Sequence, residues 1–208
     1  MAFKRLLGLW LLSVSLLFLS ACGDTEQTTL RSLSKEAVIL AFGDSLTYGT
    51  GADHLTESYP AVLSALSGRT VINAGVPGEI SREGLARIES LLEQHQPQLV
   101  LLCHGGNDLI RKLSEAELKQ NLAGMIQVIR EQGAEVAMLS VPKPGLFLKA
   151  APVYQEVAQL HQVPIENNII PDIESENSLK SDPIHPNADG YRVLAERIHE
   201  WLNQSGAL

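Results

Sequence analysis

The sequence predicts an α/β fold, a three-layer α/β/α sandwich around a central parallel sheet of about five strands. Two observations lead to this prediction. Short apolar runs alternate along the chain with segments whose apolar residues recur at helical spacing, which is typical of a parallel sheet covered by helices on both faces. With 208 residues, 45% of them hydrophobic, the chain is long enough to fill the core of one such domain.

The strands are predicted where an apolar run ends in small or polar residues. The first run, 37–42, is too short for a typical helix and reads as a buried strand, and Gly43 follows it to let the backbone turn. Four more runs are expected to be strands: 70–75, 98–103, 135–141 and 163–165. Five parallel strands suit a flavodoxin-like order with a crevice beside the first strand, although the order itself does not follow from the sequence.

Helices are predicted between these strands from capping residues and from apolar spacing. Ser58 is a candidate cap for a helix that begins near Pro60, and Ser114 with Glu117 forms a capping box for a later helix. Apolar spacing predicts three further helices, one ending near Gln94 and two at 152–161 and 188–202.

The first residues resemble a secretory signal. Lys4 and Arg5 precede a mostly apolar stretch, 6–19, which is too short to cross a bilayer comfortably; a permanent membrane anchor is the alternative interpretation. The stretch ends at 19–22 in Leu-Ser-Ala-Cys, which resembles the lipobox of bacterial lipoproteins, where the cysteine becomes the lipid-modified N-terminus. The other interpretation is an ordinary cleavage site followed by an incidental Cys22.

These features divide the chain into four parts. We expect a lipoprotein signal peptide over 1–21, a polar tether over 22–36, the folded domain over 37–203 and a C-terminal tail over 204–208. Cys22 is the expected site of lipid attachment, which would hold the protein at a membrane. Gly23 stands where enteric-type lipoproteins that stay in the inner membrane carry an aspartate. The expected location is therefore the bacterial cell envelope, with the anchor in the outer membrane and the domain facing the periplasm.

Charge and cysteine content argue against several kinds of partner. The formal net charge is −8 and no basic stripe is visible, so nucleic acid is not an expected partner. If Cys22 carries lipid, Cys103 has no partner for an intrachain disulfide, and no Cys or His spacing suggests a metal site. No metal and no cofactor are expected, and the oligomeric state stays open.

Residues suited to chemistry follow the predicted strands. The first three strands lead into Ser45, Asn73, Gly75 and Asn107. Because the carboxyl ends of parallel strands meet at one edge of the sheet, these residues are expected to lie close together. Asp182 and His185 lie three residues apart in a proline-stiffened segment before the last helix, so a turn can bring the carboxylate to one imidazole nitrogen and leave the other for a serine.

Four blocks of sequence resemble those of a known family. They are Gly-Asp-Ser-Leu at 43–46, Asn-Ala-Gly at 73–75, Gly-Gly-Asn-Asp at 105–108 and Asp-Pro-Ile-His-Pro at 182–186. In order and spacing they resemble the signature blocks of the SGNH (GDSL) hydrolases, and the chain looks most like the bacterial arylesterase, thioesterase and lysophospholipase branch. The similarity covers about 37–202, nearly the whole predicted domain.

The resemblance implies a role for each of these residues. The catalytic residues would be Ser45 as nucleophile, His185 as base and then acid, and Asp182 as the group that orients the imidazole. The oxyanion hole would consist of the backbone amides of Ser45 and Gly75 and the side chain of Asn107. The supporting residues, which organise turns by local hydrogen bonds, would be Asp44, Asn73 and Asp108. No chemistry is expected of Glu79, Cys103 or His104.

The expected function is that of a cofactor-independent serine esterase acting on small-molecule or lipid esters through an acyl-enzyme. Aryl and acyl esters are the expected substrates, with acyl thioesters and lysophospholipids as further candidates. Residues 146–148, Leu-Phe-Leu, hint at an apolar wall for an acyl chain. The alternative within hydrolases is a carbohydrate O-acetyl esterase, in which the same blocks occur. The alternative from another class is a non-catalytic lipoprotein with a hydrolase fold.

Overall fold

The computed structural model describes residues 29–145 and 148–208, and its centre is a sheet of five strands, each parallel to its neighbours. The strands run in the order β2-β1-β3-β4-β5, which is the flavodoxin-like order. Their bounds are Val38–Gly43 for β1, Thr70–Gly75 for β2, Leu99–Cys103 for β3, Glu135–Leu139 for β4 and Ile165–Glu166 for β5. The α/β prediction is therefore confirmed.

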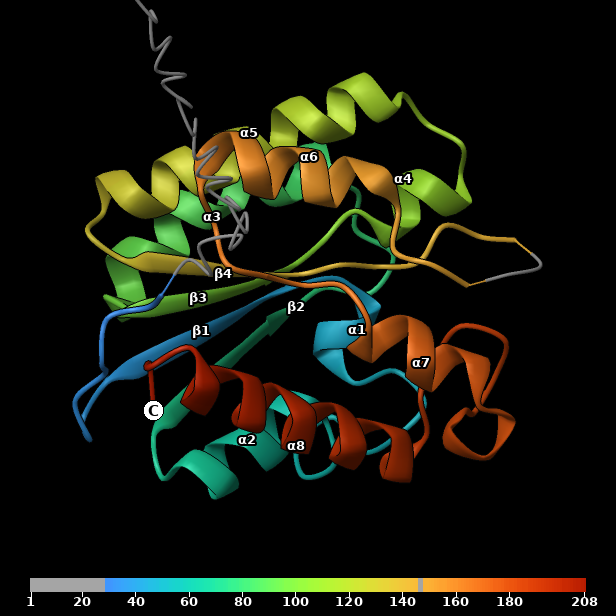
Figure 1. Cartoon of the computed structure of the whole chain (residues 1–208), viewed down its shortest axis with the longest axis horizontal. Coiled ribbons are helices and arrows are strands. Elements are labelled where there is room, and N and C mark those ends of the chain that lie inside the picture. Colours follow the sequence, from blue (N-terminus) through green and yellow to red (C-terminus); the bar gives the residue numbers. More distant parts are fainter. Residues whose placement is uncertain (1–28, 146–147) are drawn as a thin grey trace, which may run out of the picture.

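Helices cover both faces of this sheet, giving three layers (Figure 1). One outer layer contains α3, α5 and α6, and the other contains α2 and α8 with α7 beside α8. Their bounds are Tyr59–Ser67 for α2, Ser81–His95 for α3, Glu115–Glu131 for α5, Pro152–His161 for α6, Ile169–Ser175 for α7 and Ala188–Gln204 for α8. All of β3 and nearly all of β1 are buried between the layers, which explains their continuous apolar sequence.

The strand order places a crevice beside β1. The chain leaves β1 for its neighbour β2 and then crosses back to β3 on the other side, so Gly43 lies opposite Gly75 on one strand and Cys103 on the other. The connecting helices go to opposite faces of the sheet at this point, which leaves a space at the carboxyl ends of β1 and β3.

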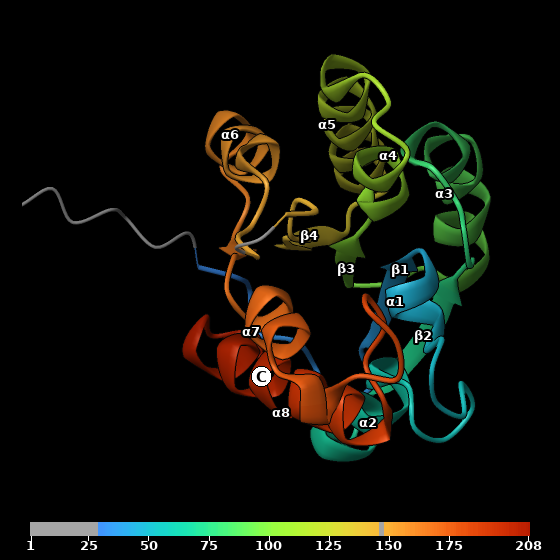
Figure 2. The same ribbon diagram turned by 90° about the vertical axis from the view of Figure 1, so that its right-hand side faces the viewer.

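Several short helices surround that edge of the sheet, and the sequence did not predict them. Figure 2 looks onto the edge and shows α1 and α4 above the ends of the strands, with α7 across from them. The bounds are Ser45–Tyr48 for α1 and Gly106–Ile110 for α4, and a 3₁₀ turn, Asn177–Leu179, follows α7. Helices of one or two turns are too short to show a helical period in the sequence.

The two predicted caps have different outcomes. Ser114 Oγ accepts a hydrogen bond from the Glu117 amide at 3.2 Å and so caps α5, as predicted. Ser58 precedes α2 but makes no capping hydrogen bond, because its hydroxyl donates to the His54 carbonyl oxygen at 2.8 Å instead. Ser58 therefore occupies the N-cap position of α2, as predicted, but its buried hydroxyl fixes the loop before the helix instead of capping the helix.

The packed domain extends beyond both predicted boundaries. Leu30 and Leu33 were assigned to the tether, but only 8% and 7% of their surfaces are exposed. Their amides donate to the carbonyl oxygens of Ser205 and Ala207, at 3.0 and 2.8 Å. The apolar side chains pack against the end of α8, so the domain includes the last part of the expected tether and most of the expected tail.

The expected signal peptide and Cys22 lie outside the described residues. Within 29–145 and 148–208, no helix has the length and apolar character needed to cross a membrane.

Candidate active site

The sharp connection from β1 into α1 depends on a glycine. Gly43 ends β1 so close to β3 and α1 that a Cβ atom there would collide with the Cys103 carbonyl oxygen and with Thr47 Oγ1. Gly43 has no positive φ, so its role differs from the expected one: it permits close packing and does not provide an unusual backbone turn. This close packing places the next residues directly at the carboxyl edge of the sheet.

Ser45 is the first residue of α1, and Asp44 caps that helix. The Asp44 Oδ1 atom accepts a hydrogen bond from the Leu46 amide at 3.1 Å, which is the turn-organising role expected of it. Burial raises the pKa of the Asp44 carboxyl group. No acceptor is found within the described ranges for the Ser45 amide, which leaves one N–H group of the first helical turn available.

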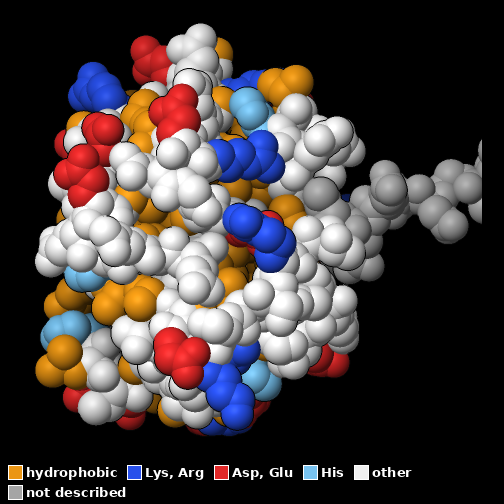
Figure 3. Space-filling view, turned by 90° about the vertical axis from the view of Figure 1, so that its left-hand side faces the viewer, with side chains coloured by type: hydrophobic (Ala, Val, Ile, Leu, Met, Phe, Trp, Pro, Cys, Tyr) orange, Lys and Arg blue, Asp and Glu red, His pale blue; other side chains and the backbone are white. Residues whose placement is uncertain are grey.

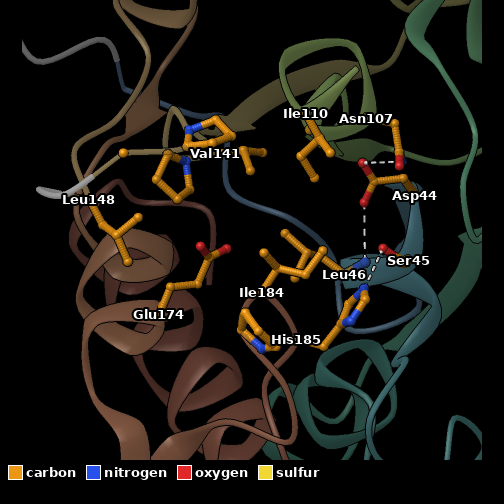
Figure 4. Close-up of a pocket in the computed structure, with 15 residues that line it drawn as sticks. Asp44, Ser45, Leu46, Asn107, Ile110, Val141, Leu148, Glu174, Ile184 and His185 are labelled. Carbon is orange, nitrogen blue, oxygen red and sulfur yellow. Dashed lines mark hydrogen bonds between the residues drawn. The ribbon is translucent and has the colours of Figure 1, made fainter. Parts of the chain in front are cut away.

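Ser45, His185 and Asp182 form one chain of hydrogen bonds. Ser45 Oγ lies 3.0 Å from His185 Nε2, and His185 Nδ1 lies 2.7 Å from Asp182 Oδ2. Figure 4 shows the His185 ring directed at Ser45 from the loop before α8. The structure therefore brings together the three residues that were predicted to be catalytic.

The Asp182 carboxylate is held in place by further hydrogen bonds. Its Oδ1 atom accepts from the backbone amides of Ile184 and His185, at 2.9 and 2.8 Å. Burial raises the pKa of Asp182, but the hydrogen bonds from the His185 ring and from these two amides outweigh burial, so the pKa lies below its usual value. Asp182 is therefore ionised at neutral pH and fixes the orientation of the ring.

The loop that carries His185 is closed by its own backbone. Ser181 donates from its amide to the His185 carbonyl oxygen at 2.9 Å, and Lys180 pairs with Pro186 in an isolated bridge. Asn187 then caps α8 by accepting from the Gly190 amide at 3.0 Å. The imidazole thus belongs to a short loop that is closed by backbone hydrogen bonds and leads directly into the long helix α8.

Asn107 points toward the same edge from α4. Its Nδ2 atom donates to the Glu79 carbonyl oxygen at 3.0 Å and lies 3.4 Å from Asp44 Oδ2 (Figure 4). The second contact is long for a hydrogen bond, so one of the two amide hydrogens is available to another acceptor.

Gly75 is placed differently from the expectation. Its amide donates to Asn73 Oδ1 at 3.0 Å, and a Cβ atom on it would collide with the backbone of Tyr48. Gly75 therefore packs against α1 and does not present a free amide. Gly78, in the same turn, has a φ of 80°, and its amide has no acceptor within the described ranges. Gly78 also precedes Glu79, whose carbonyl oxygen holds the Asn107 side chain.

The other two supporting residues organise turns as expected. Asn73 accepts from Gly75 and donates from Nδ2 to the Tyr48 carbonyl oxygen at 3.1 Å, which joins the end of β2 to α1. Asp108 is buried and accepts from the Ser81 amide at 2.8 Å and from the Ser81 hydroxyl at 2.6 Å. It thereby joins α4 to the start of α3.

A buried ionic cluster beneath the site was not predicted. Glu79 accepts hydrogen bonds from Arg87 Nε and Nη2, both at 2.6 Å, and its Oε2 atom lies 3.0 Å from His104 Nε2. Burial raises the pKa of Glu79, but the hydrogen bonds from His104 and Arg87 outweigh it and hold the pKa below its usual value. Arg87 also donates to the carbonyl oxygens of Ala74 and Gly43, at 2.9 and 3.3 Å.

This cluster connects the turns that carry the site. The Glu79 carbonyl oxygen accepts a hydrogen bond from Asn107, and Arg87 donates hydrogen bonds to carbonyl oxygens at the carboxyl ends of β1 and β2. The sequence contains no signal for it, because Glu79, Arg87 and His104 are far apart in the chain and belong to no common motif. His104 is fully buried and hydrogen-bonded, and Cys103 is buried, with a thiol pKa that burial raises well above its usual value.

A cavity of about 200 Å³ opens beside Ser45 and His185. Its walls are largely apolar and include Ile110, Val141, Pro144, Leu148, Pro183 and Ile184. The loop after β4 therefore borders the cavity through Pro144 and Leu148, while Leu146 and Phe147 lie outside the described residues. The far end also contains one carboxyl group, that of Glu174 on α7 (Figure 4).

Comparison with known proteins connects this geometry to a family of hydrolases. A model of the "GDSL-like Lipase/Acylhydrolase family" matches residues 41–193. Among characterised proteins, Esterase TesA of Pseudomonas aeruginosa is 32% identical over 193 residues, covering 88% of this chain and 94% of that protein. Thioesterase 1/protease 1/lysophospholipase L1 of Escherichia coli is 29% identical over 182 residues, covering 84% and 86%. An arylesterase of Vibrio mimicus is 30% identical over 175 residues, covering 79% and 87%.

Solved structures agree with these matches. A crystal structure of TesA has a TM-score of 0.73 at 30% identity, covering 81% of this chain and 99% of that one. AlinE4, an SGNH-hydrolase family esterase, has a TM-score of 0.62 at 30% identity, covering 84% and 98%. The residues matched by the family model, 41–193, include all four sequence blocks. The chain therefore belongs to the GDSL-like lipase/acylhydrolase family and is a serine esterase that hydrolyses carboxylic esters.

Proposed function

We propose that Ser45, His185 and Asp182 act as the catalytic triad of this esterase and that the reaction passes through an acyl-enzyme on Ser45. The observation that carries the proposal is the continuous chain of hydrogen bonds from Ser45 Oγ through His185 to Asp182, with distances of 3.0 and 2.7 Å. A serine hydroxyl is a weak nucleophile unless a base removes its proton, and His185 Nε2 is the nitrogen within reach.

In the first half of the reaction, Ser45 Oγ attacks the ester carbonyl carbon while its proton moves to His185 Nε2. Asp182 stabilises the resulting imidazolium, because its ionised carboxylate accepts from Nδ1. The tetrahedral intermediate expels the alcohol, which takes the proton from Nε2. Water then attacks the acyl-enzyme with His185 as base again, releasing the acid and restoring the Ser45 hydroxyl.

The negative oxygen of the tetrahedral intermediate needs hydrogen-bond donors. We assign the Ser45 amide and the Asn107 Nδ2 group to this role, because the amide has no acceptor within the described ranges and the Asn107 contact to Asp44 is long. The Gly78 amide is a better third candidate than that of Gly75, which already donates to Asn73. Each such donor contributes about 3 kcal/mol to stabilising the transition state.

The cavity favours esters with an acyl chain longer than acetyl. Its apolar wall continues from Ile110 past Val141 to Leu148, and an acetyl group would leave most of this wall uncovered. The names of the relatives, arylesterase and thioesterase 1/lysophospholipase L1, include chemistry of this kind. We therefore propose aryl and acyl esters as substrates, with acyl thioesters and lysophospholipids in the same class, in preference to O-acetylated carbohydrates.

A fluorophosphonate probe tests the assignment of the nucleophile. The probe reacts with an activated serine hydroxyl, so we expect wild-type protein to be labelled once per chain and the Ser45→Ala variant not at all, with peptide mapping placing the label on Ser45. Unlabelled wild-type protein, or equal labelling of Ser45→Ala, would remove Ser45 from the role of nucleophile. A Ser90→Ala variant is the control, since Ser90 is exposed on α3 and hydrogen-bonds only within its helix.

We also propose that the mature chain begins at a lipid-modified Cys22 and is held at the periplasmic face of the outer membrane. The lipobox-like residues 19–22 and Gly23 support this. The protein expressed in a Gram-negative host should fractionate with the outer membrane. The Cys22→Ser variant should be absent from that membrane and should appear either as soluble protein or as a precursor that keeps its signal peptide. Recovery of both forms in the same fraction, with no acyl mass on Cys22, would contradict the anchor.

A further inference from the structure

Two carboxyl groups outside the triad line the substrate cavity, and while Asp44 caps α1, the other has no role described so far. Glu174, on α7, is only 4% exposed, and its side chain borders the cavity near Leu148 and Ile184. Figure 4 shows its two oxygen atoms directed into the space between those residues, at the end away from Ser45. No hydrogen-bond partner of the carboxyl group is found in residues 29–145 and 148–208.

The residue is buried, but its carboxyl oxygens are open to the cavity, so a ligand that covers this part of the wall must either pair with them or leave them without a hydrogen-bond partner. Burial raises the pKa of Glu174 to about 8. Among the charged groups around it, Lys180 lowers this pKa, while Asp44 and Asp182 raise it. At neutral pH the group is therefore mainly a carboxylic acid, which offers one O–H donor and a carbonyl acceptor.

A hydroxyl group matches this pair of functions, because it also donates once and accepts. An unsubstituted alkyl chain would cover Glu174 without offering its carboxyl group a hydrogen bond. An ammonium group would instead require the ionised carboxylate.

Resting on the esterase function proposed above, we propose that Glu174 is a specificity-determining residue that selects acyl groups carrying a hydroxyl group where the chain passes α7. The hydroxyl would exchange hydrogen bonds with the Glu174 carboxyl group while the methylene groups before it cover the apolar wall. The substrates of this class are hydroxylated short- and medium-chain acyl esters.

The test compares methyl esters of hexanoic, 3-hydroxyhexanoic, 6-hydroxyhexanoic and 6-aminohexanoic acid at pH 7, with the released acid titrated. For at least one hydroxy ester, kcat/KM should exceed that of hexanoate about three- to tenfold, mainly through a lower KM. Glu174→Gln, which keeps a donor and an acceptor, should retain the preference. Glu174→Leu should abolish it and lower the KM of hexanoate. Asp172→Asn, an exposed acid on the same helix that pairs with Arg197, is the matched control.

The pH dependence of KM distinguishes a binding role of Glu174 from a purely structural one, because only a binding role links KM to ionisation of the carboxyl group. Above pH 8 the wild-type carboxyl group ionises, so the KM of hexanoate should rise there, and Glu174→Gln should not show this rise. The wild-type profile alone decides this point if the leucine variant does not fold.

The proposal is overturned by equal kcat/KM for all neutral esters, by a preference for the ammonium ester, or by a preference that survives in Glu174→Leu. If wild-type protein hydrolyses hexanoate and is labelled on Ser45 but shows no hydroxyl preference, only the assignment of Glu174 fails. If it neither hydrolyses the esters nor reacts with the probe, the esterase mechanism fails with it.

Discussion

Replacing Ser45 by alanine is expected to lower kcat for an aryl ester by about 10⁴- to 10⁶-fold, with KM changed little. The variant removes the atom that forms the acyl-enzyme, while the oxyanion donors and His185 remain to support a slow attack by water. Ser45 is half-buried, and among residues 29–145 and 148–208 its hydroxyl bonds only to His185, so the thermal midpoint should stay close to that of the wild type.

Single-turnover kinetics with an excess of enzyme check this prediction. Wild-type protein should release the aryl alcohol in a burst, and Ser45→Ala should show no burst. A loss of less than about tenfold in kcat would mean that another group attacks the ester. Ser90→Ala, the control from the labelling experiment, should behave like the wild type.

The Asp182→Asn variant is expected to lose about 10⁴-fold in kcat. An asparagine side chain can donate to Nδ1, which stabilises the ring tautomer with its proton on Nε2, and that nitrogen then cannot take the proton of Ser45. The negative charge that stabilises the imidazolium is also lost. Asp182→Ala should retain more activity than Asp182→Asn if the tautomer is the main cause.

The dependence of kcat on pH provides a second test of the role of Asp182. Because hydrogen bonds from His185 and Ile184 hold the pKa of Asp182 below its usual value, its carboxylate stays ionised through the weakly acidic range, so the first loss of wild-type activity in acid should not follow its titration. The exposed Asp189, which pairs with Arg192 on α8, provides the control variant Asp189→Asn. An Asp182→Asn variant within tenfold of the wild type would contradict the proposed orienting role.

The sequence was sufficient for those parts of the site that depend on local order. Ser45 directly follows a continuous apolar strand, and Asp182 and His185 are three residues apart between prolines, so each position could be derived from neighbouring residues. The same holds for the alternation of strands and long helices along the chain, where composition and period decide the element.

Features that depend on contacts between distant segments were not accessible from the sequence. Gly75 was expected to be an oxyanion donor because the family resemblance implied it, but its amide donates to Asn73 Oδ1 and the residue packs closely against Tyr48. Gly78, three residues later, has a φ of 80°, and its amide has no acceptor within the described ranges.

Buried acidic residues were the other feature that the sequence did not predict. Glu79 and Glu174 look like ordinary loop and helix surface residues, and only packing from other segments buries them. Arg87 and His104 form hydrogen bonds with the Glu79 carboxylate, whereas no described residue hydrogen-bonds the Glu174 carboxyl group and only the charge of Lys180 favours its ionisation. Glutamate thus stabilises the fold at position 79, whereas at position 174 its carboxyl group faces the cavity, where we propose that it binds substrate.

The pairing of Leu30 and Leu33 with Ser205 and Ala207 fixes where the start of the described chain lies relative to the crevice. Both ends of the described chain lie at the amino edge of the sheet, across the strands from α1 and α4 (Figure 1), and Figure 3 shows that side, with acidic and basic groups scattered among apolar ones. From Thr29 back to Cys22 the chain spans at most about 24 Å. If the domain is tethered to a membrane at this end, the cavity beside Ser45 would face away from the membrane. The enzyme would then reach esters dissolved in the aqueous compartment more readily than lipids embedded in that membrane.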